Sequence, residues 1–172
     1  MALLPEIIPP TVQAIYERYE KKAKDWRRPH LGASVIGRTC TRHIWYLFRW
    51  ASKPVKSGRI EALLGRGDRE ETRISKDLRA SGVELVTREA GNQIRVTFGP
   101  HTGGSLDGEG TGFLEAPATT HVYECKTASA KNFAVIKAKG VKVAKPEHWA
   151  QMQVYMHERR RTRAAYFVVN KD

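Results

Sequence analysis

The spacing of apolar residues along this chain changes from a helical period to an alternating one and then back. Up to about residue 80 the apolar side chains recur every three or four positions, as in an amphipathic helix. Between Val83 and Lys126 they alternate with polar residues, as in a strand with one buried face. Helical spacing returns before a last apolar strand. This order predicts an α/β or α+β domain whose central mixed sheet is flanked by helices.

Five helices are expected from this spacing and from residues that start or stop helices. They cover residues 11–26, 40–50, 59–80, 129–139 and 146–159. Pro29 follows the first, Ser81-Gly82 closes the third, Ser129 caps the fourth and Pro146 opens the fifth. The second helix is dense in apolar residues, so we expect Trp45 and its neighbours to be buried.

Strands are expected at residues 83–85, 94–98, 103–107, 121–126 and 164–169. A length of 172 residues, 41% of them hydrophobic, suits one domain with a real core. We expect residues 1–30 to form an N-terminal helical extension and residues 31–172 the core of the same single domain.

The chain contains two cysteines, Cys40 and Cys125, which lie far apart in sequence. They form no CxxC pair, which argues against a structural zinc site or a disulfide framework and fits a reducing compartment. The N-terminus lacks the pattern of a signal peptide, and no apolar run approaches membrane-spanning length. A cytoplasmic protein without membrane segments is expected.

The chain is strongly basic, with 30 Lys and Arg residues against 18 acids and a net charge of +12. A globular protein of this charge usually has a polyanionic partner. Nucleic acid is the first candidate and an anionic membrane surface the second. An incidentally basic surface is the alternative that composition alone leaves open.

The residues best suited to catalysis are Asp107, which lies between glycines, and the Glu124-Cys125-Lys126 segment. Residues two apart on a strand point to the same face, so Glu124 and Lys126 project together while Cys125 points away. Two carboxylates from neighbouring strands form an oxygen-rich site suited to Mg²⁺ or Mn²⁺. A lysine beside them can position or deprotonate an attacking water, or stabilise a developing oxyanion. The backbone carbonyl of Cys125 is a further candidate ligand.

Each of these motifs also has an ordinary interpretation. A Glu-x-Lys strand is often a surface ion pair, and Asp-Gly is a common turn. The apolar flanks, with Val122 and Tyr123 on one side and Ala128 on the other, indicate a buried strand instead. A buried acid and a buried lysine on one face are costly unless they serve each other or a metal.

The order of Asp107, Glu124-x-Lys126 and a helix bearing Gln151-x-x-x-Tyr155 resembles the PD-(D/E)XK nuclease superfamily. The resemblance is to its phage-type branch, the lambda-exonuclease-like and RecB-like exonucleases. Residues 31–50 and the segment Gly67–Glu71 resemble the same branch, so the likeness covers the chain from about residue 31 onward.

The resemblance implies a role for each matching residue. Asp107 and Glu124 would be metal ligands and Lys126 the catalytic lysine. Glu71 would complete the metal site, with its neighbour Glu70 as the alternative. Gln151 and Tyr155 match the family's helix motif, which orients the active site and contacts the DNA strand; they lie four apart and share one helix face.

Contacts to DNA are expected from two segments. The residues are Ser34, Arg38 and Arg42 in the N-terminal part, and Thr127, Ser129 and Lys131 after the catalytic strand. The lysines from 137 to 145 form either a DNA-facing loop or a solvated charged face. The arginines from 159 to 163 either follow a DNA backbone or cap the preceding helix. Among the histidines, His148 is expected closest to the site.

The resemblance therefore implies a Mg²⁺-dependent deoxyribonuclease, an exonuclease of phage recombination or DNA processing that works in the host cell cytoplasm. Mn²⁺ would substitute for Mg²⁺, and with two cysteines no iron–sulfur cluster is expected. Its partners would be DNA ends or single strands and a single-strand annealing recombinase, with homo-oligomerisation left open. A structure-specific, resolvase-like endonuclease and a non-catalytic DNA-binding module of the same fold are the alternatives.

Overall fold

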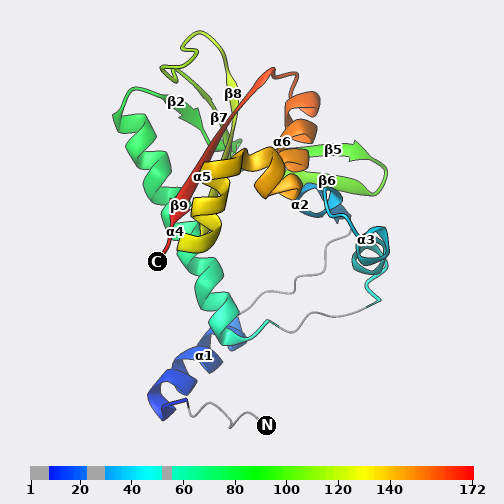
Figure 1. The fold of residues 1–172 in the computed structure, drawn as a ribbon, viewed down its shortest axis with the longest axis vertical. Helices are drawn as coiled ribbons and strands as arrows, with labels where there is room; N and C mark the ends of the chain where they lie inside the picture. Colours follow the sequence, from blue (N-terminus) through cyan, green and yellow to red (C-terminus); the bar gives the residue numbers. More distant parts are fainter. Residues whose placement is uncertain (1–7, 23–29, 52–55) are drawn as a thin grey trace.

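The computed structural model describes residues 8–22, 30–51 and 56–172 (Figure 1). Its helices are α1 (Pro10–Lys22), α2 (Ala33–Ile36), α3 (Thr41–Phe48), α4 (Gly58–Ala80), α5 (Ala130–Ala144) and α6 (Pro146–Glu158). Its strands are β1 (Leu31–Gly32), β2 (Glu84–Val86), β3 (Arg88–Glu89), β4 (Asn92–Gln93), β5 (Arg95–Gly99), β6 (Thr102–Ser105), β7 (Gly108–Thr111), β8 (His121–Ala128) and β9 (Arg163–Asn170).

A four-stranded mixed sheet in the order β2-β7-β8-β9 forms the centre of the fold. The strands β2 and β8 each run antiparallel to β7, and β9 runs parallel to β8 along the whole length of β8. Tyr123 and Cys125 of β8 belong to a buried cluster against which Ile74 and Leu78 of α4 pack. Val122, on the other face, packs with residues of α6. The prediction of an α/β domain with a central mixed sheet between helices is confirmed.

A second, three-stranded sheet in the order β1-β6-β5 lies beside the first. The chain passes from this sheet to the central one through Leu106 and Asp107, which separate β6 from β7. Leu106 is fully buried and its main-chain N–H donates to the carbonyl of Ile94, 2.9 Å away. The position of Asp107 is therefore fixed at the junction of the two sheets.

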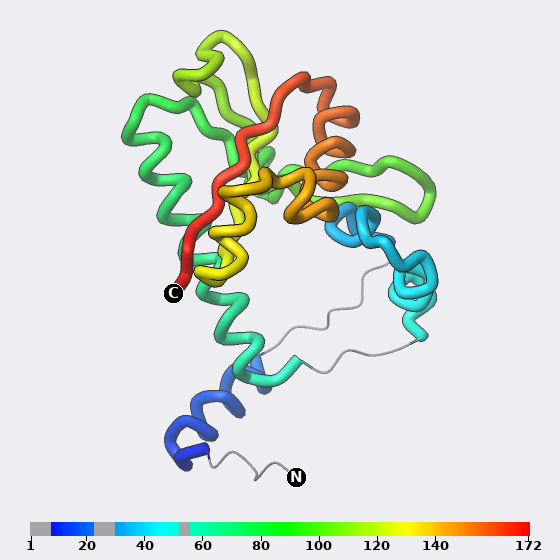
Figure 2. The backbone as a smooth tube through the Cα atoms, viewed as in Figure 1, coloured from blue at the N-terminus to red at the C-terminus, as the bar shows by residue number. Residues whose placement is uncertain are grey.

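The N-terminal helix α1 packs against α4 and lies at the opposite end of the molecule from α6 (Figure 2). The backbone N–H of Gly58, the first residue of α4, donates to Glu20 Oε1 at 2.7 Å. Residues 23–26 of the first predicted helix, and Pro29 after it, lie outside the described residues.

The structure differs from the sequence-based expectations in several places. Trp45 is 54% exposed and no residue of α3 is buried, because dense apolar spacing produces burial only where another element covers the helix. The fourth helix was expected to end at residue 139, but α5 continues to Ala144 across a kink at Gly140, whose φ is 71°. Of the two alternatives for this lysine-rich stretch, the loop is therefore excluded for Lys142. The strand β7 was not predicted.

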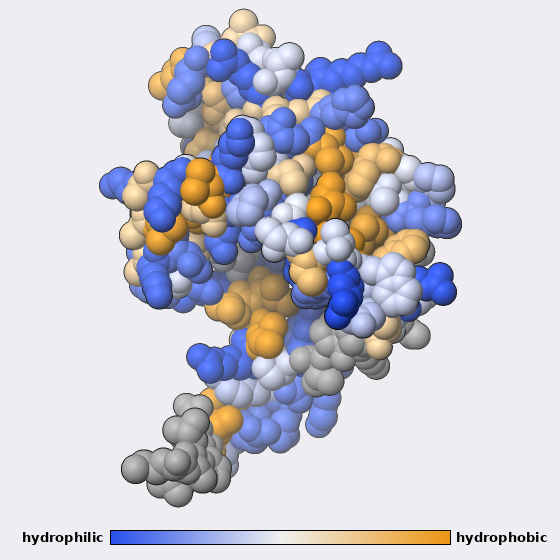
Figure 3. Space-filling view, turned by 45° about the vertical axis from the view of Figure 1, so that its right-hand side comes forward, coloured by the Kyte–Doolittle hydropathy of each residue, from blue (hydrophilic) through white to orange (hydrophobic). Residues whose placement is uncertain are grey.

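The surface is mainly hydrophilic. In the face shown in Figure 3, hydrophilic residues dominate and hydrophobic residues gather in separate patches. No helix in the described part of the chain is both long enough and apolar enough to cross a membrane.

Candidate active site

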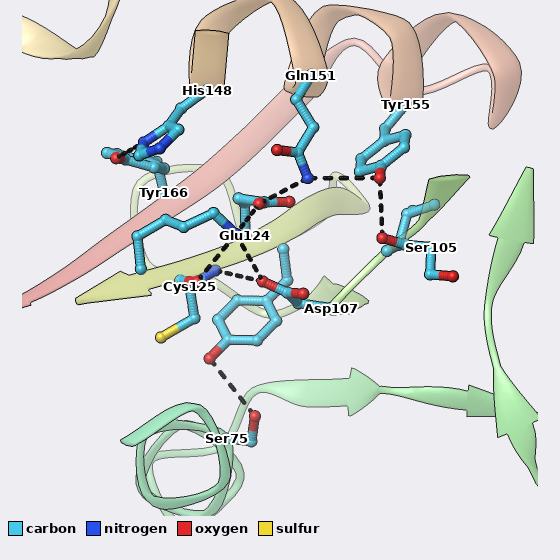
Figure 4. A network of polar contacts seen from close by, with 12 residues as sticks. Ser75, Ser105, Asp107, Glu124, Cys125, His148, Gln151, Tyr155 and Tyr166 are labelled. Carbon is cyan, nitrogen blue, oxygen red and sulfur yellow. Dashed lines mark hydrogen bonds and ion pairs between the residues drawn. The ribbon is translucent and has the colours of Figure 1, made fainter. Parts of the chain in front are cut away.

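Residues from three separate parts of the fold meet at the middle of β8 (Figure 4). Asp107 comes from the junction between β6 and β7, Glu124 and Lys126 come from β8, and Gln151 comes from α6. The structure thus brings together Asp107, Glu124, Lys126 and Gln151, which were expected to form one site although they lie far apart in the chain.

Lys126 lies between the two carboxylates. Its ammonium contacts Glu124 Oε1 and lies 3.7 Å from Asp107 Oδ2. It also donates to the carbonyl of Cys125 at 3.3 Å, which places that carbonyl at the site as well. Burial lowers the pKa of Lys126, but the charges of Glu124 and Asp107 outweigh burial and raise it above its ordinary value.

Asp107 is anchored to β8 by a backbone contact. Its Oδ2 accepts a hydrogen bond of 2.8 Å from the main-chain N–H of Cys125. The thiol of Cys125 lies on the opposite face, in the core cluster with Tyr123, as the period of a strand predicts. The Asp107 carboxylate is 12% exposed, so it faces the site from a nearly buried position.

Glu124 is fully buried, and its contacts with Gln151 and Lys126 both involve the same carboxylate oxygen, Oε1. Its Oε1 accepts a hydrogen bond of 2.9 Å from Gln151 Nε2, whereas no described residue gives its buried Oε2 a hydrogen bond. Burial, and next the charge of Asp107, raise the pKa of Glu124 to about 7. A buried carboxylate oxygen without a partner is costly, so this atom is available to a ligand.

Gln151 and Tyr155 connect α6 to the site from above β8 in Figure 4. Gln151 Nε2 also lies 3.4 Å from the Tyr155 hydroxyl, which donates to the carbonyl of Ser105 at 2.9 Å. The Ser105 contact was not foreseen, because only the pairing of β6 with β5 brings this carbonyl beneath α6. The chain of hydrogen bonds fixes the rotamer of Gln151 and, through it, the orientation of Glu124.

Glu71 on α4 is a partly buried acid close enough to Asp107 for the charge of Asp107 to affect its pKa. Burial raises its pKa to about 7, and the charge of Asp107 adds to the effect. Glu70, the alternative, forms an ion pair with Arg73 at 2.9 Å on the same helix. One turn before Glu71, a Cβ at Gly67 would lie 3.9 Å from Thr127 Oγ1, so this face of α4 is turned toward the end of β8.

His148 and Tyr166 adjoin the site. Tyr166 pairs with Glu124 in the β8–β9 register, and its hydroxyl lies 2.7 Å from His148 Nδ1. Burial, and next the charge of Lys126, lower the pKa of His148 to about 4. His148 was expected near the site, whereas no sequence pattern indicates Tyr166, which the parallel pairing of β9 with β8 brings next to Glu124.

The donor set suits a hard divalent cation. Asp107, Glu124 and Glu71 offer carboxylate oxygens, the preferred donors of Mg²⁺ and Mn²⁺, and Glu124 Oε2 is buried without a partner among the described residues. Within the part of the chain that the structure describes, no group of three or more His, Cys, Asp or Glu residues is already gathered as a metal site. Lys126 lies between the carboxylates instead, and its ammonium balances their charge.

The residues expected to contact DNA separate into three groups. Ser34 lines a cavity of about 770 Å³ that also touches Gln151 and Tyr155. Thr127 and Ser129 line a second cavity of about 210 Å³ beside Lys126. The others, Arg38, Arg42 and Lys131, are exposed and line neither cavity. The Arg38 guanidinium contacts a histidine, with Nη1 lying 3.0 Å from His43 Nε2.

Of the two roles expected for the arginines after α6, the structure shows helix capping for Arg159, whose backbone N–H closes α6, and it adds a role that was not expected. Arg159 and Arg161 both pair with Glu109 of β7, with closest distances of 2.8 Å. Burial alone would raise the pKa of Glu109, but hydrogen bonds and charge from the two arginines lower it to about 2. These guanidinium groups therefore serve the fold.

Comparison with known proteins found no matching family model, no matching curated protein and no matching solved structure.

Proposed function

We propose that the chain is a metal-dependent deoxyribonuclease of the PD-(D/E)XK type that hydrolyses phosphodiester bonds. The observation that carries this proposal is the contact of Lys126 with both Asp107 and the fully buried Glu124, while the side chains of Lys126 and Asp107 are 28% and 12% exposed. Removing such charges from water costs folding free energy, and an ion pair on the surface avoids that cost. The net charge of +12 supplies the long-range attraction that a DNA substrate requires.

The carboxylates of Asp107, Glu124 and Glu71 would hold Mg²⁺ or Mn²⁺, and the Cys125 carbonyl lies close enough to the site to join them. When bound, such an ion polarises the attacking water and compensates charge on the phosphate. Gln151 orients Glu124 through its 2.9 Å hydrogen bond. These residues keep the donors in place before substrate arrives, which is the condition for electrostatic stabilisation of a transition state.

Lys126 acts as a cation in this scheme. Its pKa lies above the ordinary value because two carboxylates surround it, so it is protonated at neutral pH. A protonated lysine cannot accept the proton of an attacking water. It can place its charge beside the phosphate oxygen that becomes more negative during attack.

The two cavities beside the site give a DNA strand a route across it. The larger one, about 770 Å³, reaches Gln151 and Tyr155 and offers Ser34, His30 and Arg95 as donors. Its size is within the roughly 300–1,000 Å³ typical of ligand sites. The smaller cavity begins at Lys126.

Within this class, we propose an exonuclease that processes DNA ends in phage recombination. The test is digestion of end-labelled linear DNA beside covalently closed circular DNA, with Mg²⁺ or with EDTA. An exonuclease shortens the linear DNA in Mg²⁺ alone and leaves the circle intact. Cutting of the circle would instead indicate a structure-specific endonuclease. The absence of any Mg²⁺-dependent change in either DNA would indicate a non-catalytic binding module.

The residue assignment is tested with Lys126→Ala, with Lys76→Ala as the matched control. Lys76 is exposed on α4, outside the site. We expect Lys126→Ala to bind DNA yet lose hydrolysis by roughly a hundred-fold or more, as on removal of a group that stabilises transition-state charge. The control should match the wild type. Full activity of Lys126→Ala would contradict the proposed role of Lys126 in hydrolysis.

A further inference from the structure

The cavity of about 210 Å³ beside Lys126 lies where the ends of β8 and β9 meet the starts of α5 and α6. Its walls carry hydroxyl, amide and imidazole groups as well as lysines. The polar lining residues are Lys126, Thr127, Ser129, Asn132, Lys145, His148, Tyr166 and Lys171. Hydrogen-bond donors thus surround one small space that adjoins the candidate active site.

The charged residues in the wall of this cavity are lysines. Three lysines line it, and no acidic residue does among the described residues that form its wall. The acids near these lysines lie outside the wall. Asp107 and Glu124 contact Lys126, Glu147 lies 3.8 Å from Lys145, and Asp172 accepts a 2.7 Å hydrogen bond from the backbone of Ala130. The wall itself offers an occupant lysine ammonium groups and neutral polar groups, which favour an anion.

Lys126 belongs to both the cavity and the candidate active site, so an anion in the cavity lies next to the phosphate being hydrolysed. Tyr166 strengthens this connection because it pairs with Glu124 in the sheet and is held by His148 at 2.7 Å. Lys171 is fixed at the rim by its backbone N–H, which donates to the carbonyl of Ala128 at 3.0 Å. Point charges from lysine together with hydroxyl and amide donors are typical of contacts to a nucleic-acid phosphate.

We propose that this cavity is a subsite for a second phosphate of the DNA strand, the neighbour of the phosphate that the candidate active site hydrolyses. The proposal rests on the proposed function for the identity of the polyanion. Lys145 and Lys171 hold the phosphate by charge, and Ser129, Asn132 and Tyr166 hold it by neutral donors. The subsite fixes the register of the strand relative to Lys126.

The first test compares the double variant Lys145→Gln/Lys171→Gln with Lys21→Gln/Lys22→Gln, which removes the same charge from the exposed end of α1. Binding of a labelled single-stranded oligonucleotide is measured by fluorescence anisotropy in EDTA over a range of salt concentrations. We expect the cavity variant to bind roughly ten-fold more weakly. Its slope of log K against log salt should fall by about 0.7, the value for one phosphate contact on a single strand. The control should keep the wild-type slope; equal losses in both variants would overturn the subsite.

The second test replaces one phosphate at a time with an uncharged methylphosphonate. One position should weaken wild-type binding but have no further effect on the cavity variant, because both changes remove the same contact. Cleavage products formed with Mg²⁺ then show whether that position is next to the scissile bond. Additive losses at every position, or a sensitive position elsewhere in the strand, would overturn the proposal. Absence of any cleavage would contradict the proposed function alone, since the binding result does not depend on it.

Discussion

The side-chain amide of Gln151 on α6 donates a hydrogen bond of 2.9 Å to Glu124 Oε1 on β8. Both side chains are buried, and neither the amide oxygen of Gln151 nor the second carboxylate oxygen of Glu124, Oε2, has a hydrogen-bond partner among the described residues. The contact joins α6 to β8 at the carboxylate oxygen that also contacts Lys126, and Tyr155 supports Gln151 from the other side.

Loss of the Gln151 amide should lower activity without unfolding the protein. In Gln151→Ala the Glu124 carboxylate loses its only donor on α6, and partners of this kind behind a metal ligand are typically worth 10- to 100-fold in metal affinity or activity. We expect a loss of about that size in Mg²⁺-dependent hydrolysis. Gln153→Ala is the matched control, because Gln153 is exposed on the same helix. Equal activity of the two variants would show that Gln151 does not position Glu124.

The raised pKa values of Glu71 and Glu124, both about 7 against an ordinary 4.5, predict how stability depends on pH. Between pH 4.5 and 7 the folded protein keeps protons that the unfolded chain has released, so the metal-free protein loses stability as pH rises through this window. A divalent cation binds the ionised carboxylates, so its stabilising effect should grow with pH.

The measurement is the melting temperature at pH 5.5 and pH 8, in EDTA and in Mg²⁺. The reference is Glu71→Gln/Glu124→Gln, which retains His148. That reference is needed because the pKa of His148 is lowered to about 4, and this shift increases stability as pH rises toward 6.5. Relative to the reference, the wild type should lose stability with pH in EDTA and regain it in Mg²⁺. The same Mg²⁺ effect at both pH values would contradict the prediction.

The strand β8 could be predicted because its signal is local. Alternation in β8 places Glu124 and Lys126 on one face, whatever the rest of the chain does. The strand β7 carries no such signal, since Gly108-Glu109-Gly110-Thr111 has no large apolar residue. It exists because glycines fit where a side chain would clash: a Cβ at Gly110 would lie 2.9 Å from the ring of Phe113.

Other parts of the site depend on pairing between distant segments. Tyr166 approaches Glu124 through the parallel register of β9 with β8, and Ser105 approaches Tyr155 because β6 lies under α6. No spacing in the sequence encodes either contact. Burial of α3 was predicted wrongly for a related reason: Trp45 has the side chain of a core residue, but the described elements do not cover it.

The ion cluster around Glu109 should contribute strongly to stability. Its carboxylate is 9% exposed and is held by Arg159 and Arg161, so Glu109→Ala leaves two guanidinium groups without their main partner. We expect the free energy of unfolding to fall by roughly 3 kcal/mol, as when one member of a buried ion cluster is removed. Urea unfolding measures the loss, with Glu115→Ala in an exposed turn as the control.

Low pH should reduce the difference in stability between the wild type and Glu109→Ala. The pKa of Glu109 is lowered to about 2, so its contribution is complete above about pH 4.5 and is lost as pH falls toward 2. Wild type and Glu109→Ala should therefore converge in stability at low pH. A constant difference between them from pH 7 to pH 2.5 would mean that the cluster does not act through charge.

Close packing at Gly104 should link the second sheet to the active site. A Cβ at this position would lie 2.5 Å from the Tyr155 hydroxyl and 3.0 Å from the Cβ of Ala33. Gly104→Ala must therefore displace Tyr155, which breaks its 2.9 Å hydrogen bond to the Ser105 carbonyl and moves the helix that carries Gln151. We expect a loss of about 1–3 kcal/mol in the free energy of unfolding, the usual cost of overpacking, and a further loss of hydrolysis under conditions where the variant is folded.

The matched control for this substitution is Gly65→Ala on α4. The nearest atom to a Cβ there is Arg69 Nη1, at 3.7 Å, so the methyl group fits. Because glycine inside a helix is less stable than alanine by about 0.5–1 kcal/mol, Gly65→Ala should stabilise the protein and leave hydrolysis unchanged. Urea unfolding and initial rates on linear DNA measure both effects. Should Gly104→Ala retain wild-type rates, Tyr155 would not need its contact with Ser105 for catalysis, and the link between the second sheet and Glu124 would be purely structural.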